Sequence, residues 1–289
     1  MIVDAIKKNV NREVLSSEEA SQAMKEIMSG SATPSQISAF LISLSMKGES
    51  IEEIVALAKT MKEFANRINP THGSRLVDIV GTGGDKIKTI NLSTISAFVL
   101  AASEITIAKH GNRAATGKCG SADVLDRLGY RLDTKPEKVK ESIEKNGIGF
   151  MFAPIFHPAM KNVIGTRKEI GVRTIFNILG PLTNPASADS MIVGVANTEL
   201  VDKYSKILPE LGCKRAIIVH GLDGLDEIAT FGETKMRFIG DLENEGKEII
   251  VKPDDFGLKK INAQDIAGTG IDYNAEVMYK ILANRLDID

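Results

Sequence analysis

The chain has no tryptophan, only two cysteines and almost no net charge. Cys119 and Cys213 do not have the spacing of a metal-binding pair, and so few thiols are typical of a reduced compartment. The 36 lysines and arginines nearly balance the 38 acidic residues, which gives a formal net charge of -2. With no tryptophan and this balance of charges, nothing suggests the basic, aromatic-rich surface typical of nucleic-acid-binding proteins, so we expect no nucleic-acid partner.

Long hydrophobic runs are also missing. No stretch approaches the roughly 20 apolar residues of a membrane-spanning helix, and no long apolar segment follows residues 1–8 as an export signal requires. We therefore expect a cytoplasmic protein without a membrane partner. What remains is an ordinary globular composition, 43% hydrophobic and 26% charged over 289 residues, which is enough for two domains or one large one.

The first 68 residues carry signals for helices only. Ser16, Thr33 and Ser50 are each followed three positions later by Glu or Gln, which is the spacing of the capping box at a helix N-terminus. Apolar residues then recur at helical spacing, a pattern more typical of packing surfaces than of ligand contacts. Because a helical unit this short usually packs on a larger body, we expect it to carry a subunit interface as well.

Residues 69–74 are predicted to be a linker, beyond which apolar strands alternate with helices. Strands are predicted near residues 76–80, 105–108, 150–152, 191–195 and 216–219, and helices from about residue 93 and over about 121–128. This alternation predicts an α/β fold in which helices cover both faces of a parallel sheet. Ligands of such sheets bind beyond the carboxyl ends of the strands, so the loops that follow the strands are the candidate sites.

The loop after the first predicted strand contains Gly81, Gly83 and Gly84, followed by Asp85. Glycine accepts a positive φ and has no Cβ, so backbone N–H groups can converge on an anion at close range. The helix that follows adds the partial positive charge of its N-terminus. These features predict a phosphate or diphosphate cradle, and a tight turn without a ligand is the alternative.

The loop after the second predicted strand, residues 109–121, is a second candidate. It combines lysine and arginine with three glycines and several hydroxyl or amide groups, and Ser121 opens the next helix. This composition favours anion binding. The alternative is a solvated surface loop.

Two acidic residues and one arginine complete the candidates. Asp226 and Glu227 follow the fifth predicted strand, and such a pair suits Mg²⁺, which usually takes one or two carboxylates plus phosphates and waters. Arg167, in a helix-like stretch, has the forked guanidinium that binds a carboxylate. The alternatives are a solvated turn for the acidic pair and a surface ion pair for Arg167.

Several motifs together resemble those of the anthranilate phosphoribosyltransferases of tryptophan biosynthesis. In chain order they cover residues 81–85, 91–94, 109–114, 120–125, 157–160, 173–185 and 226–227. They occur in the family's order across nearly the whole chain, which makes the resemblance specific.

The resemblance implies an α/β protein with a small discontinuous α-helical domain and a larger α/β domain around a mainly parallel central sheet. The helical domain is expected at residues 1–68, with residues from about 165 to 188 returning to it. The α/β domain, which binds phosphoribosyl diphosphate, is expected at residues 75–164 and 189–289. A homodimer formed through the helical domain is also implied. Because the chain stops at Asp289, the family's last C-terminal helices are expected to be missing.

The implied reaction transfers phosphoribose from phosphoribosyl diphosphate to the amino group of anthranilate, with Mg²⁺ as cofactor and diphosphate as leaving group. By position, phosphoribosyl diphosphate is expected to contact Gly81, Gly84, Asp85, Thr89, Asn91, Leu92, Ser93, Thr94, Lys109, His110, Gly111, Asn112, Arg113, Ala114, Ala115, Thr116, Gly117 and Ser121. Anthranilate is expected near Gly81, Asn112, His157, Arg167 and Gly180, and Mg²⁺ at Ser93, Asp226 and Glu227. The aromatic amine is already uncharged near neutral pH, so no residue is assigned as a general acid or base.

Two other functions are open from the sequence. A nucleoside phosphorylase has a related fold, but its Ser-Thr-Gly-Gly loop and its lysine-serine motif do not occur here. The second is a non-catalytic relative that binds nucleic acid or a phosphoribosyl ligand, although the net charge of -2 does not favour nucleic acid. One departure from the family pattern is Lys86, which stands where the family usually has glycine.

Overall fold

The computed structural model describes residues 1–73, 75–84, 87–114, 119–240 and 245–285. Its first part is helical, as predicted, with α1 (Ile2–Val10), α2 (Ser17–Met28), α3 (Pro34–Lys47) and α4 (Ile51–Glu63). All three predicted capping boxes are present. At the start of α2, the Ser16 hydroxyl accepts a hydrogen bond from the Glu19 N–H at 3.2 Å, and the Glu19 carboxylate accepts one from the Ser16 N–H at 2.9 Å.

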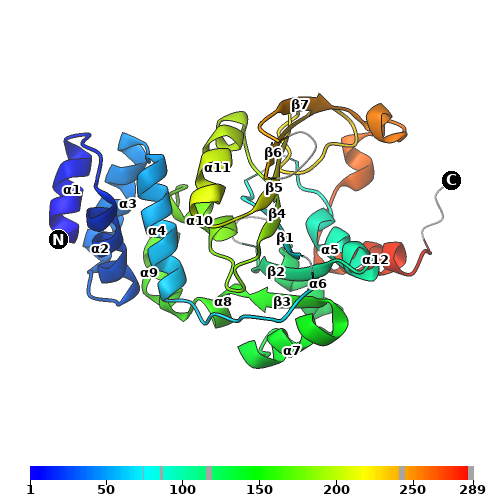
Figure 1. Cartoon of the computed structure of the whole chain (residues 1–289), viewed down its shortest axis with the longest axis horizontal. Helices are drawn as coiled ribbons and strands as arrows, with labels where there is room; N and C mark the ends of the chain where they lie inside the picture. The colour runs from blue at the N-terminus through cyan, green and yellow to red at the C-terminus, as the bar shows by residue number, and fades with distance from the viewer. Residues whose placement is uncertain (74, 85–86, 115–118, 241–244, 286–289) are drawn as a thin grey trace.

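A seven-stranded sheet forms the centre of the molecule (Figure 1). Its strands are β1 (Leu76–Gly81), β2 (Thr106–Gly111), β3 (Ile148–Phe152), β4 (Ser190–Gly194), β5 (Arg215–Gly221), β6 (Thr234–Ile239) and β7 (Glu248–Val251). They lie in the order β3-β2-β1-β4-β5-β6-β7, with β1 to β5 parallel and β6 and β7 antiparallel to their neighbours. The mainly parallel sheet is confirmed. The prediction lacks β6 and β7. In β6, between β5 and β7, apolar residues alternate with charged ones, and β7, at the edge of the sheet, has only the short apolar run 249–251.

Helices cover both faces of the sheet, as predicted. They are α5 (Leu92–Ala102), α6 (Ser121–Arg127), α7 (Pro136–Asn146), α8 (Ala153–Phe156), α9 (Lys161–Ile170), α10 (Phe176–Leu182), α11 (Thr198–Glu210) and α12 (Ile271–Leu282), with short 3-10 helices at Pro158–Met160, Pro253–Phe256 and Ala263–Ile266. On one face, Ile95 of α5, Leu125 of α6 and Met278 of α12 share an apolar core with Phe150 of β3. On the other face, α7 packs through Val139 against β2 and β3, and α11 packs against β4 and β5.

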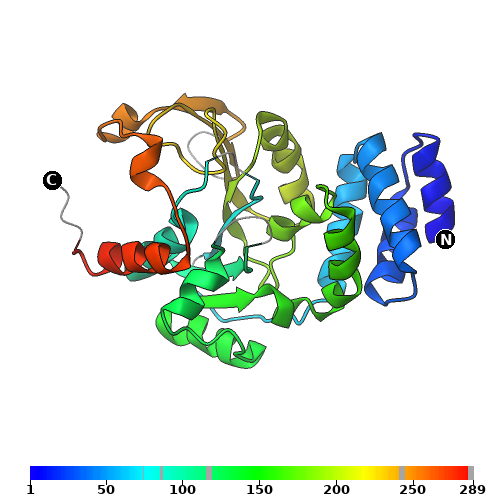
Figure 2. The ribbon, with the colours of Figure 1, turned by 180° about the vertical axis from the view of Figure 1, so that it is seen from behind.

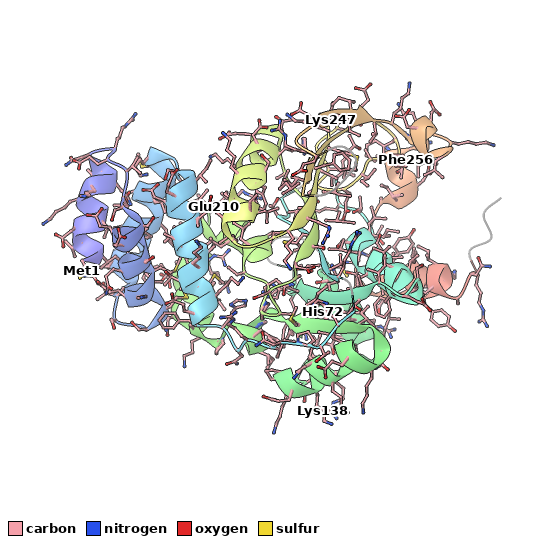
Figure 3. The ribbon with its side chains drawn as sticks, viewed as in Figure 1. Met1, His72, Lys138, Glu210, Lys247 and Phe256 are labelled. Carbon is pink, nitrogen blue, oxygen red and sulfur yellow. The ribbon has the colours of Figure 1, made fainter. Side chains whose placement is uncertain are left out.

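The segment between β3 and β4 returns to the first four helices. Val163 of α9 and Leu179 of α10 are buried in the same apolar core as α2, α3 and α4, and the Asn162 side chain donates a hydrogen bond to the Met28 carbonyl at 2.9 Å. We call α1–α4, α9 and α10 the helical part. It occupies one end of the molecule and α12 the other (Figure 2). In the stick view, Met1, just before α1, and Phe256, beyond β7, lie on opposite sides of the sheet (Figure 3).

The strand order creates a crevice at the carboxyl ends of the strands. From β1 the chain moves outward to β2 and β3, then returns to add β4 on the other side of β1. Loops after β1 and β4 therefore leave the sheet in opposite directions, and ligands of α/β proteins bind at such a point. Within the described ranges, no helix is both long enough and apolar enough to cross a membrane.

Candidate functional site

Two adjoining cavities of about 280 and 510 Å³ lie beyond the carboxyl ends of β1 and β2. Thr82, Gly83, Ser93, Asp226 and Glu227 line both of them. The structure brings together, around one cavity or the other, every described residue of the predicted site: Gly81, Gly84, Thr89, Asn91, Leu92, Ser93, Thr94, Lys109, His110, Gly111, Asn112, Arg113, Ala114, Ser121, His157, Arg167, Gly180, Asp226 and Glu227. Asp85, Lys86, Ala115, Thr116 and Gly117 lie outside the described residues.

The glycines at the ends of β1 and β4 are required by the close approach of Asp226. A side chain at Gly81 would overlap the Asp226 carboxylate, and one at Gly194, the partner of Gly81 in the β1–β4 register, would overlap the Asp226 backbone. The Gly83 N–H donates a hydrogen bond to the Asp226 carboxylate at 2.8 Å. Gly83 and Gly84 have φ values of +63° and +86°, in the left-handed region that favours glycine. The loop is thus shaped to hold the acidic segment against the ends of β1 and β4.

Lys109 lies at the junction of β1, β2 and α5. Its side chain is buried, and its ammonium group donates to the Ile79 carbonyl at 2.6 Å and to the Ser93 hydroxyl at 3.3 Å. Burial lowers the pKa of Lys109, while the carboxylates of Asp78 and Glu227 act in the opposite direction. The resulting site has a desolvated cation beside the first turn of α5, where the helix dipole also favours an anion.

Asp78 supports this arrangement from inside β1, a role that the sequence prediction missed. It is fully buried and accepts hydrogen bonds from the Asn184 side chain at 2.7 Å and from the His110 N–H at 3.2 Å. Burial raises the pKa of Asp78 to about 6, and the Lys109 charge opposes that rise. A carboxylate within an otherwise apolar strand was the available signal, because buried charges need partners.

The larger cavity has a second, less polar region. The imidazole rings of His110 and His157 lie with their centroids 5.0 Å apart, and burial lowers their pKa values to about 3 and about 4, so both are uncharged at neutral pH. The Arg167 guanidinium lies over the Phe176 ring, 5.3 Å from its centroid, and burial lowers its pKa. No ion pair of Arg167 occurs among the described residues, so its alternative as a surface ion pair is not supported. With Gly180 and Asn112 on the same cavity wall, this region suits a small aromatic carboxylate.

The oxygen donors at the boundary of the cavities fit Mg²⁺. The carboxylates of Asp226 and Glu227 and the hydroxyl of Ser93 are hard ligands of the type this ion prefers. Among the described residues no group of three or more His, Cys, Asp or Glu side chains forms a complete metal cage. An ion held here would therefore need further oxygens from water or from a phosphorylated substrate, which is typical of Mg²⁺.

Two residues of the smaller cavity were given no role in the sequence prediction. Arg173 reaches the glycine loop from between α9 and α10, and Asn274 reaches the same cavity from α12. The Asn274 side chain donates to the Asn91 side chain at 3.0 Å across 183 positions of sequence. Neither contact has a local signal, because it depends on where distant segments meet.

Comparison with known proteins defines the class first. Residues 3–65 match the helical bundle domain of a glycosyl transferase family, and residues 73–288 match its a/b domain. The fold and the site are therefore those of a transferase with a helical bundle and an α/β domain.

Two relatives of high identity have the same activity. The anthranilate phosphoribosyltransferase of Persephonella marina is 46% identical over 288 residues, 99% of this chain and 84% of the relative. That of Methanocorpusculum labreanum is 48% identical over 283 residues, 98% of this chain and 82% of the relative. The chain belongs to the anthranilate phosphoribosyltransferase family, and it is an enzyme of the transferase class.

Solved structures agree over nearly the whole chain. Anthranilate phosphoribosyltransferase from Thermus thermophilus superposes with a TM-score of 0.91 at 42% identity, covering 98% of this chain and 84% of the other. The Saccharomyces cerevisiae enzyme in complex with PRPP and Mg has a TM-score of 0.91 at 29% identity, with 99% and 82% covered. Its complex with 4-fluoroanthranilate has a TM-score of 0.87 at 28% identity, with 99% and 81% covered. The expected combination of a helical part and an α/β part is confirmed.

Proposed function

We propose that this chain transfers the phosphoribosyl group of phosphoribosyl diphosphate to the amino group of anthranilate, which gives N-(5-phosphoribosyl)anthranilate and diphosphate, a step of tryptophan biosynthesis. The observation that carries the proposal is the pairing of two unlike cavities. The smaller cavity has the glycine loop and the acidic pair, which it shares with the larger one. The larger cavity adds the buried Lys109, which contacts Ser93 on the shared boundary, and the half-buried Arg167 beside an aromatic ring. The first suits a diphosphate and the second an aromatic acid. Family membership supports the same reaction.

The diphosphate side of the site acts on the leaving group. When the C1–O bond breaks, negative charge develops on the diphosphate, and fixed donors that are already oriented stabilise this charge more in the transition state than in the ground state. Lys109 and the N-terminal turn of α5 are such groups. Ser93, Asp226 and Glu227 would hold Mg²⁺, which when bound supplies positive charge to the diphosphate oxygens. Gly81, Gly84 and the segment 109–114 would surround the phosphoribosyl group.

The other side of the site positions the acceptor. Arg167 would bind the anthranilate carboxylate through its fork, with Gly81, Asn112, His157 and Gly180 around the ring. The amine is uncharged near neutral pH and already has a free electron pair, so orientation against the sugar carbon replaces the need for a base. The pKa values of His110 and His157, about 3 and about 4, agree with this reading, because rings that stay uncharged do not repel the cationic sugar.

Assembly and location are part of the proposal. Val3 and Val10 on α1 and Met46 on α3 are exposed apolar side chains on the helical part, and we place a homodimer interface there. The expected location is the cytoplasm.

One assay tests the reaction. Purified chain with phosphoribosyl diphosphate, Mg²⁺ and anthranilate should consume anthranilate, followed by the loss of its fluorescence. Arg167→Ala should weaken use of anthranilate by about 2–5 kcal/mol, as expected when one partner of a desolvated charge pair is removed. Binding of diphosphate without turnover would reject the transferase and favour a non-catalytic relative. Phosphate-dependent cleavage of a nucleoside would instead favour a phosphorylase.

A further inference from the structure

Arg173 lines the smaller cavity and touches the glycine loop directly. It stands between α9 and α10, just after Gly171, whose φ of +68° ends α9. Its guanidinium donates a hydrogen bond to the Gly83 carbonyl at 3.3 Å. The same group fills the space that any side chain at Gly84 would need. The absence of a Cβ at Gly84 therefore lets a cation from the helical part lie directly on the loop.

The charge of Arg173 is not neutralised within the described part of the chain. No ion pair there joins it to a carboxylate, and its hydrogen bond to Gly83 uses one of the five N–H donors of a guanidinium. Around the same cavity lie donors, at Thr89, Asn91 and the N-terminal end of α5, and the carboxylates of Asp226 and Glu227, which are the proposed Mg²⁺ ligands. An arginine stays protonated at any physiological pH. The cavity wall thus contains a permanent cation with unused donors beside the glycine loop.

We propose that Arg173 binds the diphosphate of the substrate from the helical side of the crevice. This inference rests on the proposed function for the identity of the anion. A guanidinium fork pairs with two phosphate oxygens at once, and charge-assisted bonds of this kind are about twice as strong as neutral ones. The Arg173 side chain is exposed, and its hydrogen bond to the Gly83 carbonyl directs the guanidinium toward the loop.

The position of Arg173 gives its contact a second consequence. The glycine loop belongs to the sheet, whereas α9 and α10 share their apolar core with α2, α3 and α4. A diphosphate held by both would join the helical part to the α/β part across the crevice. The anion would then tighten the cavity in which the acceptor binds.

The test compares Arg173→Gln and Arg173→Lys with an exposed control, Arg131→Gln, whose ion pair with Asp133 is far out in solvent. Inorganic diphosphate with Mg²⁺ is titrated into each protein by calorimetry at low and at moderate salt. Arg173→Gln should raise the dissociation constant for diphosphate about ten- to a hundredfold, the range for a lost charge-assisted hydrogen bond. Arg173→Lys should lose less affinity than Arg173→Gln, because it keeps the charge, but some affinity should be lost because lysine lacks the fork. The control should match the parent protein.

Two outcomes would overturn the assignment. An unchanged dissociation constant in Arg173→Gln would remove the residue from the diphosphate site. If both variants lose the same affinity for diphosphate and also melt at lower temperatures, Arg173 only stabilises the loop and does not bind the anion. The proposed function is tested separately. If the parent protein binds diphosphate through Arg173 but does not consume anthranilate, the transferase fails and this inference stands. If the parent protein consumes anthranilate and Arg173→Gln binds diphosphate normally, the transferase stands and the role of Arg173 is rejected.

Discussion

The ammonium group of Lys109 donates a hydrogen bond to the main-chain carbonyl of Ile79 at 2.6 Å, across the β1–β2 pair. The lysine is only 4% exposed, and the charge of Asp78 opposes the lowering of its pKa by burial. A flexible surface lysine would have to be ordered each time an anion binds. Lys109 is already held by its partners, which is the condition for stabilising a leaving group without further reorganisation.

Lys109→Met should therefore affect both folding and turnover. Removing one of two opposite buried charges costs up to about 3–5 kcal/mol. The desolvated Asp78 carboxylate would keep its hydrogen bonds from Asn184 and His110 but lose the opposing charge of Lys109. The same change should lower kcat/KM by about 10²-fold or more, as for other lost charge-stabilising donors. Urea unfolding measures the first effect and initial rates measure the second.

The double variant Asp78→Asn/Lys109→Met separates the two effects. Removing both charges should restore most of the free energy of unfolding, since no unpaired buried charge is left. It should not restore turnover, because the cation near the diphosphate is still missing. Recovery of both properties together would show that Lys109 acts on stability alone.

Gly194→Ala should disturb the metal site without touching any proposed metal ligand. A Cβ at this position would overlap the Asp226 backbone, so the segment that carries Asp226 and Glu227 must shift. Overpacking of this kind costs about 1–3 kcal/mol, and we expect the Mg²⁺ concentration for half-maximal rate to rise about tenfold or more. Metal titrations of the initial rate measure this.

Gly165→Ala is the matched control for that substitution. Gly165 lies within α9, and the space where a Cβ would stand is open. Alanine is the better helix former by about 0.5–1 kcal/mol, so the variant should be slightly more stable and keep the parent Mg²⁺ dependence. An equal change in both variants would exclude the proposed contact between Gly194 and Asp226 as the cause.

The parts of the fold that follow from local signals could be predicted from the sequence. Ser16, Thr33 and Ser50 begin helices because each hydroxyl satisfies an N–H three residues along the same chain. The loops after β1 and β2 could be identified as candidate sites because parallel strands bring their carboxyl ends to one edge. The roles of their residues, and the boundaries of the discontinuous helical domain, stay predictions.

The remainder depends on contacts between distant segments. The role of Asp78, a carboxylate in an apolar strand, is not visible locally, because its hydrogen-bond donor Asn184 lies 106 positions later in the sequence. Arg173 reaches the glycine loop only because the chain returns to the helical part between β3 and β4. The partners of β6 and β7 are likewise set by the sheet as a whole, since their own residues are only partly buried.

The stability of the protein should fall as the pH is lowered below about 6.5, and the two histidines of the site should cause much of the fall. Their pKa values are lowered by burial from 6.5 to about 3 for His110 and about 4 for His157. Between about pH 4 and 6.5 the unfolded chain therefore binds two protons that the folded chain does not, so stability rises with pH. Asp78 acts oppositely: its pKa is raised from 3.8 to about 6, so its contribution falls as the pH rises through that window.

Substitution of both His110 and His157 by asparagine should remove the part of the stability that rises with pH. The slope of unfolding free energy against pH should decrease by about 3 kcal/mol per pH unit between pH 4 and 6, which corresponds to two protons. Urea unfolding at a series of pH values gives the slopes, and His72→Asn, on the exposed linker, is the control. If the slope of the double variant equals that of the parent protein, the histidine pair is not the source.

Asn274 should be needed for phosphoribosyl diphosphate but not for anthranilate. Asn274 is 2% exposed, and its side chain donates a hydrogen bond to the Asn91 side chain. The Asn91 amide in turn donates to the Cys119 carbonyl at 3.4 Å. These hydrogen bonds connect α12, the start of α5 and the loop before α6. The carbonyl oxygen of the Asn274 side chain is buried and has no partner in the described protein. Asn274→Ala leaves Asn91 without its donor, and the loss of one such bond, about 1 kcal/mol, should raise the KM for phosphoribosyl diphosphate about five- to tenfold. The KM for anthranilate should stay unchanged, as it should for both substrates in Asn146→Ala, an exposed control at the end of α7. A rise in both KM values, or in neither, would contradict a role for this amide chain in shaping the diphosphate cradle.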